Sequence, residues 1–235
     1  MRRCVIFDLD GTLVDTPRGI VTTFAAVFAQ LDLPTADSPT IRGTIGLGLP
    51  AAFAKILGVP EDEPVVTRCV ELYRPTFRKI VLPVASQLVF PGVYDGLRSL
   101  RENGFLLAVA TNRFVAPAEE LLTAAGLRDE FSVVVGADQV PEPKPDPAAG
   151  LLVLDRLGVT PDNAVMVGDT TYDIDMARGA GMSSVAVTYG VHGADQLLSA
   201  GPTWLAGSFA EAVVSARRRR PASGSRSRTS RSPRP

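Results

Sequence analysis

Histidine and cysteine are scarce in this sequence, and their scarcity limits the chemistry that it can support. His192 is the one histidine among 235 residues, so neither a Ser/His/Asp triad nor a Cys/His pair can be assembled without it. The two cysteines, Cys4 and Cys69, match no metal-binding or redox spacing. We therefore expect two reduced thiols in a cytoplasmic protein.

Long apolar runs are also missing. No segment approaches the roughly 20 apolar residues that a transmembrane helix needs. The first apolar run is ended by Asp8, well before the roughly 7–15 apolar residues of a secretory signal. We expect neither membrane insertion nor export. Hydrophobic residues nevertheless make up 46% of the chain, which is ample for a packed core.

Acidic residues are absent from one end of the chain. Residues 217–235 contain eight arginines and no acid, whereas residues 1–216 hold the other 16 basic residues and all 25 acids, a net charge of −9. The segment 217–235 has almost nothing apolar to bury, so we expect a disordered tail. Nucleic-acid binding through its arginines is an alternative. A solvated extension is favoured. Arginine greatly outnumbers lysine along the whole chain, so the arginines of the tail are weak evidence of a function of that segment.

Short apolar runs alternate with helical patterns over most of the sequence. Continuous β-branched runs suit strands that are buried on both faces of a parallel sheet. The predicted strands are 4–7, 106–110, 132–135, 164–167 and 184–188, and the predicted helices between them are 93–102, 116–125, 147–157 and 172–180. This alternation predicts an α/β domain with a Rossmann-like, doubly wound parallel sheet.

Residues 16–89 interrupt the alternation. They contain no convincing strand, and apolar residues recur at helical spacing in 20–31, 49–57 and 65–73. We predict a helical domain inserted after the first strand, with the α/β domain built from 1–15 and 90–216.

Polar side chains follow four of the predicted strands at their C-terminal ends. They are Asp8, Asp10 and Thr12 after the first, Thr111, Asn112 and Arg113 after the second, Lys144 after the third, and Asp169 and Asp173 after the fourth. Ligands of an open α/β sheet bind at this edge. The sequence therefore predicts that these side chains share one site.

The chemistry of this set favours phosphoryl transfer. Neighbouring carboxylates can stay ionised when a divalent cation joins them, and oxygen ligands of this kind suit Mg²⁺. A lysine beside them suits a phosphate group. Asp8 could then attack phosphorus as a carboxylate nucleophile, and Asp10 could protonate the leaving oxygen.

Four motifs in the chain resemble those of the haloacid dehalogenase superfamily, in the same order. They are Asp8-x-Asp10-x-Thr12, Thr111-Asn112, Lys144-Pro145 and Gly168-Asp169-x-x-x-Asp173. The resemblance implies an Mg²⁺-dependent phosphatase in which Asp8 forms an aspartyl-phosphate. It also implies that residues 16–89 form a cap domain that closes over the site and selects the leaving group.

The resemblance also implies roles for the other motif residues. Asp10 acts as acid and then as base, and its backbone carbonyl contacts the metal. Thr111 and Lys144 hold the phosphoryl group, Asp169 binds the metal, and Asp173 supports the metal or its waters. The implied metal-binding set is Asp8, Asp10, Asp169 and Asp173.

Softer similarities point to the phosphoglycolate phosphatase-like branch of the superfamily. They lie at 44–49, 71–74, 90–93 and 144–147. The expected substrate is a small phosphorylated metabolite, with 2-phosphoglycolate as the named candidate. Thr111, Asn112 and Arg113 are assigned to substrate binding. Arg113 replaces the lysine that is usual in this branch, so a planar guanidinium with several donors stands where the compact ammonium of a lysine is expected.

Several alternatives remain at this stage. A pyrophosphatase or a sugar phosphomutase would use the same fold, and a metal-free dehalogenase is disfavoured by the additional carboxylates. An alternative of another class is a non-catalytic protein that binds nucleic acid through its basic tail. Arg42, Arg74 and His192 are either substrate contacts or ordinary surface residues. Both a monomer and a homodimer are compatible with the sequence.

Overall fold

The computed structural model describes residues 2–218 of the chain. The strands are β1 (Arg3–Phe7), β2 (Phe105–Ala110), β3 (Val133–Val135), β4 (Ala164–Gly168), β5 (Ser183–Val187) and β6 (Trp204–Ala206). The α-helices are α1 (Pro17–Gln30), α2 (Ser38–Arg42), α3 (Leu49–Leu57), α4 (Pro64–Ile80), α5 (Val93–Glu102), α6 (Val115–Ala124), α7 (Ala148–Leu157), α8 (Thr171–Gly179), α9 (Ala194–Ser199) and α10 (Phe209–Ala216). Short 3-10 helices are η1 (Leu82–Leu88), η2 (Arg128–Glu130), η3 (Ala137–Gln139) and η4 (Pro161–Asn163).

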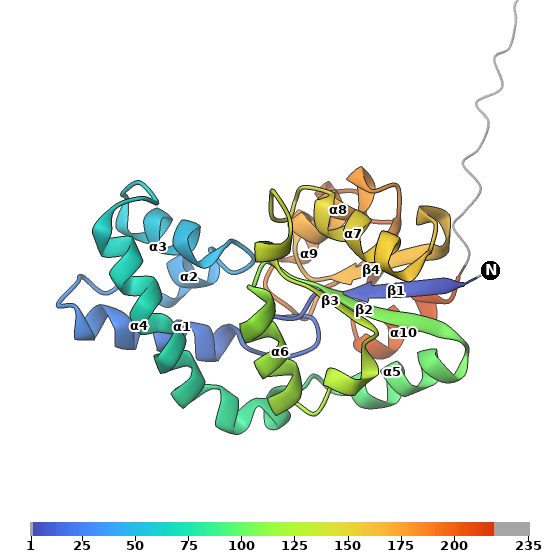
Figure 1. Cartoon of the computed structure of the whole chain (residues 1–235), viewed down its shortest axis with the longest axis horizontal. Helices are drawn as coiled ribbons and strands as arrows, with labels where there is room; N and C mark the ends of the chain where they lie inside the picture. Colours follow the sequence, from blue (N-terminus) through green and yellow to red (C-terminus); the bar gives the residue numbers. More distant parts are fainter. Residues whose placement is uncertain (1, 219–235) are drawn as a thin grey trace, which may run out of the picture.

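The strands form one parallel sheet in the order β3-β2-β1-β4-β5-β6 (Figure 1). β1 is central, and its residue Ile6 lies opposite Ala108 of β2 and Met166 of β4. The chain runs outward from β1 to β2 and β3 and then crosses back to β4 on the other side. The strand order therefore reverses beside β1, and such a switch point is where α/β sheets bind ligands.

Helices cover both faces of the sheet, and β1 shows why. Its side chains alternate between two cores: Cys4 and Ile6 join the cluster that contains residues of α7 and α8, whereas Val5 and Phe7 join the cluster with α5 and α10. All four are buried. A strand that is buried on both faces needs apolar residues at every position rather than at alternate ones, which is the pattern of this run.

The predicted α/β fold is confirmed, and the five predicted strands match β1 to β5 to within two residues at each end. The structure adds β6, which pairs with β5 at the edge of the sheet, and the flanking helices α9 and α10. β6 is too short for its hydrophobic pattern to be distinguished from a loop.

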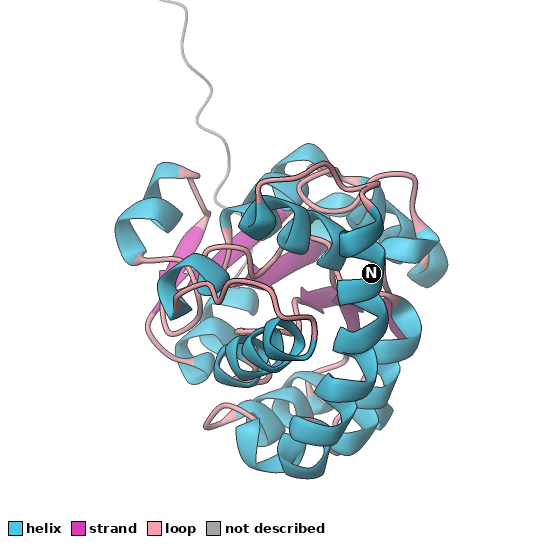
Figure 2. Ribbon diagram, turned by 90° about the vertical axis from the view of Figure 1, so that its left-hand side faces the viewer, coloured by secondary structure: helices cyan, strands magenta, loops and turns pink. Residues whose placement is uncertain are grey.

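Residues 16–89 are helical in the structure. α1 to α4 lie beside the C-terminal edge of the sheet, and Figure 2 views the molecule from their side. Each of these four helices begins with a proline in its first turn, where the missing N–H is not needed and the fixed φ angle favours the helix. Phe24 packs against Phe53 and Tyr73 at ring-centroid distances of 4.3 and 5.2 Å. The inserted helices thus have an aromatic core of their own.

Two chain segments connect the inserted helices to the sheet, and they run side by side. The Asp15 amide donates to the Leu88 carbonyl at 2.7 Å, and the Phe90 amide donates to the Leu13 carbonyl at 3.1 Å. An antiparallel bridge joins Val14 to Val89.

In the described residues, no helix is long and apolar enough to cross a membrane.

The predicted start of the basic tail, residue 217, lies within the folded part of the chain. Arg217 is half-buried, and its Nη2 donates to Ser99 Oγ at 2.6 Å, so this residue belongs to the folded part. Residues 219–235 lie outside the described residues.

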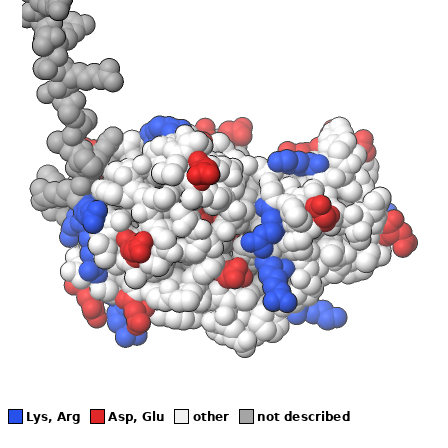
Figure 3. Space-filling view, turned by 180° about the vertical axis from the view of Figure 1, so that it is seen from behind, with Lys and Arg blue, Asp and Glu red and all other residues white. Residues whose placement is uncertain are grey.

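On the face in Figure 3, basic side chains gather in a short column near the junction with the inserted helices, and acidic side chains are scattered over both parts.

Candidate active site

Asp8 stands at the C-terminal end of β1, beside the switch point of the sheet. Its amide donates to the Val167 carbonyl of β4 at 2.9 Å, which extends the strand pairing by one residue. Gly11 then turns the chain with φ +87°. A Cβ at Gly11 would lie 2.3 Å from Asp169 Oδ2, so only glycine fits the turn. The two acids have separate cations, because Lys144 contacts Asp8 and Arg113 contacts Asp10, and this allows the chain to hold two acids two residues apart.

Lys144 is buried among the acids. Its Nζ donates to Asp8 Oδ1 at 2.6 Å, to Asp173 Oδ1 at 2.7 Å and to the Ala110 carbonyl at 2.9 Å. Burial alone would lower the pKa of Lys144, but the charges of Asp173 and Asp8 outweigh burial and raise it. The ammonium therefore stays charged and can face a phosphoryl oxygen.

Asn112 fixes the main chain of Lys144. Its Oδ1 accepts from the Lys144 amide at 2.8 Å, and its Nδ2 donates to the Lys144 carbonyl at 2.9 Å and to the Gly46 carbonyl at 2.6 Å. The side chain was expected to bind phosphate. In the structure it positions the lysine and reaches the inserted helical segment, because both amide hydrogens already have acceptors.

Three carboxylates form a buried cluster. Oxygens of Asp8, Asp169 and Asp173 lie within 4.8 Å of one another, and the three residues are 6%, 0% and 1% exposed. Lys144 contacts two of them, and no cation contacts Asp169 among the described residues. Such a set leaves negative charge uncompensated. Its oxygen ligands and its charge fit a hard divalent cation such as Mg²⁺.

The pKa values of this cluster follow from its burial. Desolvation raises the pKa of Asp8 to about 7, with Lys144 opposing and Asp173 adding to the shift. Desolvation also raises the pKa of Asp169 well above its ordinary value, helped by the charges of Asp8 and Asp173. A cation at the cluster would favour the ionised forms of both acids.

Asp169 is held by the loops around it. Thr12 Oγ1 donates to Oδ1 at 2.7 Å, and the Val191 amide donates to Oδ2 at 2.8 Å. Gly190 passes so close that a Cβ there would lie 2.3 Å from the same carboxylate. Tyr189 donates its hydroxyl to the Thr12 carbonyl at 2.9 Å. The contacts of this loop after β5 with Asp169 were not predicted from the sequence.

Asp173 has two structural contacts. Its Oδ2 accepts from the Thr170 amide at 3.0 Å and from Thr170 Oγ1 at 2.7 Å, while its Oδ1 faces Lys144. Thr170 is the N-cap of α8. Thr170 and Asp173 thus form a capping box at the start of α8.

The Asp10 carboxylate points away from the cluster. Arg113 Nε donates to Oδ2 at 2.9 Å and Nη2 donates to Oδ1 at 2.7 Å, and Thr16 Oγ1 donates to Oδ1 at 2.5 Å. Burial would raise the pKa of Asp10, but Arg113 and Thr16 together lower it. Arg113 was expected to bind the substrate. In the structure its guanidinium contacts Asp10 and lies 4.5 Å from the ring centroid of Phe77.

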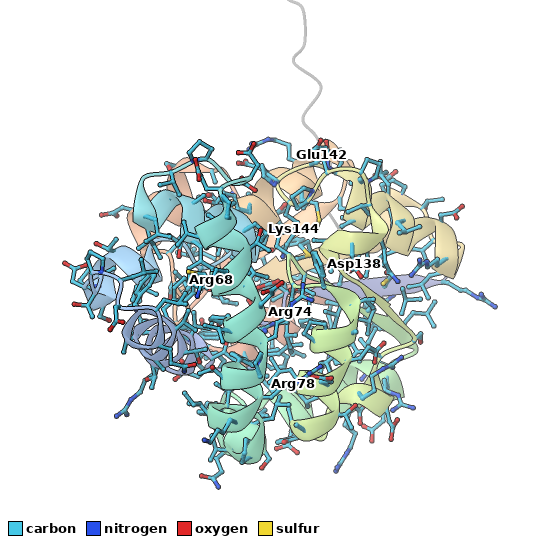
Figure 4. The ribbon with its side chains drawn as sticks, turned by 60° about the vertical axis from the view of Figure 1, so that its left-hand side comes forward. Arg68, Arg74, Arg78, Asp138, Glu142 and Lys144 are labelled. Carbon is cyan, nitrogen blue, oxygen red and sulfur yellow. The ribbon has the colours of Figure 1, made fainter. Side chains whose placement is uncertain are left out.

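The remaining candidates are Arg42, Arg74 and His192. Arg42 is exposed, and Arg74 is exposed with its guanidinium 5.1 Å from the Phe114 ring centroid. Figure 4 shows Arg74 and Arg78 on the side of α4 that faces α6. His192 is half-buried, its Nδ1 accepts from the Thr171 amide at 3.1 Å, and burial lowers its pKa. The His192 side chain thus stabilises the start of α8 and does not contact the acid cluster.

A pocket of about 230 Å³ lies over the site, between the inserted helices and the edge of the sheet. Asp8, Asp10, Thr111 and Lys144 line it from the sheet side, and residues of α1, α3 and α4 line it from the other. Together the sheet, the acid cluster and the lysine form a Rossmann-like α/β domain with a buried carboxylate, Asp8, beside the switch point of the sheet.

Known proteins with similar sequences are hydrolases of one family. Residues 5–187 match the family of haloacid dehalogenase-like hydrolases. The chain is 50% identical over 216 residues to a Dickeya dadantii protein named "Probable phosphatase IndB", covering 92% of this chain and 94% of that one. It is 37% identical over 195 residues to a phosphoglycolate phosphatase of Rhodospirillum rubrum, covering 81% of each.

The solved structures show the same relationship. A haloacid dehalogenase-like family hydrolase from Streptococcus pneumoniae superposes with a TM-score of 0.78 at 27% identity, covering 91% of this chain and 98% of that one. The chain belongs to the haloacid dehalogenase-like hydrolases, and with its phosphatase relatives it is a phosphoric monoester hydrolase.

Proposed function

We propose that this protein is a Mg²⁺-dependent phosphatase of a small phosphorylated metabolite that works through an aspartyl-phosphate on Asp8. The observation that carries the proposal is the contact set of Asp8: Lys144 lies 2.6 Å away, and Asp169 and Asp173 complete a buried carboxylate cluster. When bound there, Mg²⁺ would neutralise charge on the phosphoryl group and on the acids.

The residues of the chain would divide the reaction between them. An Asp8 oxygen attacks phosphorus, the bond from phosphorus to the ester oxygen breaks, and a proton from Asp10 goes to the leaving alcohol. Asp10 then takes a proton from water, which attacks the phosphoryl-aspartate and releases phosphate. The ion pair with Arg113 lowers the pKa of Asp10. It favours the ionised form that takes a proton from water in the second half-reaction and opposes the protonated form that the first half-reaction requires. Lys144 and Thr111 would hold the phosphoryl oxygens.

The inserted residues 16–89 would act as the cap over this site. Asn112 and Arg113 already reach the inserted segment, through the Gly46 carbonyl and the Phe77 ring. The name of the Rhodospirillum rubrum relative makes 2-phosphoglycolate the first metabolite to test.

Phosphate release tests the proposal. Asp8→Asn is expected to abolish release while the circular dichroism spectrum stays unchanged. Asp175→Asn is the matched control, because Asp175 lies on α8 in an exposed ion pair with Arg178, and it should keep full activity. Chelation should stop the wild-type reaction, and added Mg²⁺ should restore it. Retained turnover in Asp8→Asn would refute the aspartyl-phosphate mechanism.

A further inference from the structure

The part of the pocket that lies against the inserted helices is apolar. Its walls there carry aromatic rings and branched aliphatic side chains: Ile20, Phe24, Ile45, Leu47, Leu49, Tyr73, Phe77 and Leu82. Apolar cavities of about 150 Å³ hold a molecule of the size of benzene. The pocket, at about 230 Å³, has room for a ring-sized group in addition to a phosphoryl group.

Three of the four cations that line the pocket already form ion pairs. Lys144 contacts two acids, Arg113 makes its two-point contact with Asp10, and Arg78 pairs with Glu120 at 2.5 Å. Arg74 is the one lining cation without an ion pair in the part of the chain that the structure describes. It is exposed and stacks over Phe114. A carboxylate on the leaving group would therefore find only the exposed Arg74 as a counter-charge, and placing it against the apolar wall away from Arg74 is costly.

The polar side chains of the lining are engaged as well. Thr44 donates to the Ile41 carbonyl at 2.7 Å, Thr170 donates to Asp173, and both amide hydrogens of Asn112 have acceptors. Few groups remain to bind a polar substituent. A leaving group that carries a charge would lose its hydration against this apolar wall and gain few polar contacts there.

Phe114 is a second indication. It is 40% exposed, and of the large hydrophobic side chains that are exposed among residues 2–218 it alone lines the pocket. An isolated exposed hydrophobic residue needs no explanation, but an exposed ring at a pocket mouth can cover an apolar ligand.

We propose that the leaving group of the natural substrate is an uncharged alcohol bearing an apolar, ring-sized substituent, and that Phe114 contacts this substituent. The proposal rests on the phosphatase function above. It places the carboxylate-bearing 2-phosphoglycolate among the poor substrates of this chain.

The test compares esters whose leaving alcohols are of similar basicity. Phosphate release is measured with Mg²⁺ for benzyl phosphate, 4-carboxybenzyl phosphate, ethyl phosphate and 2-phosphoglycolate. We expect kcat/KM for benzyl phosphate to exceed that of each of the other three by about tenfold or more. The comparison of benzyl phosphate with 4-carboxybenzyl phosphate tests the effect of a charge on the leaving group. The comparison with ethyl phosphate tests the effect of the ring.

Two variants connect the preference to the pocket. Phe114→Ala is expected to lower kcat/KM for benzyl phosphate by about tenfold and to leave that for ethyl phosphate unchanged. Leu151→Ala is the matched control, because Leu151 is 46% exposed on α7 and does not line the pocket. Leu47→Lys should improve 2-phosphoglycolate relative to benzyl phosphate by placing a cation in the apolar wall.

The outcomes separate this proposal from the one on which it rests. Release from 2-phosphoglycolate at a higher kcat/KM than from benzyl phosphate would overturn the substrate class and keep the phosphatase. A selective loss of 2-phosphoglycolate turnover in Arg74→Gln would do the same, because it would show a guanidinium that receives a carboxylate. Release from none of the four esters by the folded protein would overturn both.

Discussion

Asp10 and Arg113 are 103 residues apart in the sequence and form a two-point ion pair, with Nη2 2.7 Å from Oδ1 and Nε 2.9 Å from Oδ2. Their side chains are only 15% and 13% exposed. The pair joins the loop after β1 to the loop after β2, and Phe77 of α4 covers its outer side. One contact thus connects the acid/base candidate to both parts of the molecule.

Removing the guanidinium should cost stability. Arg113→Gln leaves Asp10 buried without its cation, and loss of one partner of a buried pair costs about 3 kcal/mol. Arg113→Lys keeps the charge but loses the second hydrogen bond, so its cost should be smaller. Urea unfolding measures both. Equal stability of the wild type and Arg113→Gln would contradict the pair's structural role.

The cost of Arg113→Gln should depend on pH. The pair lowers the pKa of Asp10 in the folded state, below the ordinary value of about 3.9 in the unfolded chain. Its stabilisation is therefore complete above that value and is lost as pH falls through the folded pKa. The difference in unfolding free energy between wild type and variant should be largest at neutral pH and shrink as pH falls toward 3, because acid also protonates the uncompensated Asp10 of the variant. A difference that grows in acid would show the opposite sign.

The main features of the site could be predicted from sequence because the sheet does the positioning. Asp8, Lys144 and Asp169 follow different strands, and parallel strands bring their C-terminal ends to one edge. The structure gathers these three at contact distance. Strand identity and order along the chain were sufficient for this, and no side-chain geometry had to be known.

Side-chain partners within loops could not be predicted in the same way. Nothing in the sequence around Arg113 indicates that its guanidinium contacts Asp10. Likewise Asn112 was assigned to phosphate and is found on the main chain of Lys144. Such contacts depend on how two loops approach each other, and no periodicity reports that distance. β6 was missed for a different reason, since a three-residue strand carries almost no pattern.

Removing one charge from the acid cluster should stabilise the metal-free protein. Asp169→Asn relieves repulsion with Asp8 and Asp173, and its amide can still accept from the Val191 amide and donate to Thr12. We expect a gain of about 1 kcal/mol without metal. Mg²⁺ should raise the melting temperature of the wild type and have little effect on the variant. An equal Mg²⁺ response in both proteins would place the ion elsewhere.

Gly11 offers a test of the close approach in the site. Gly11→Ala forces a side chain into a left-handed conformation and puts Cβ 2.3 Å from Asp169 Oδ2. Gly58 is the matched control, because its φ is +69° and a Cβ there would meet nothing within 4 Å. Backbone strain costs about 1–2 kcal/mol at either position. The additional contact should make Gly11→Ala the more destabilising change.

The two substitutions also differ in what they should do to function. Gly58 ends α3, away from the pocket lining, so Gly58→Ala should keep wild-type turnover and the wild-type response to Mg²⁺. Gly11→Ala displaces Asp169 and should lose both at a temperature where it is still folded. Equal losses of stability with intact turnover in both variants would mean that backbone strain alone matters at Gly11. In that case Asp169 can move away from the turn without any cost to the site.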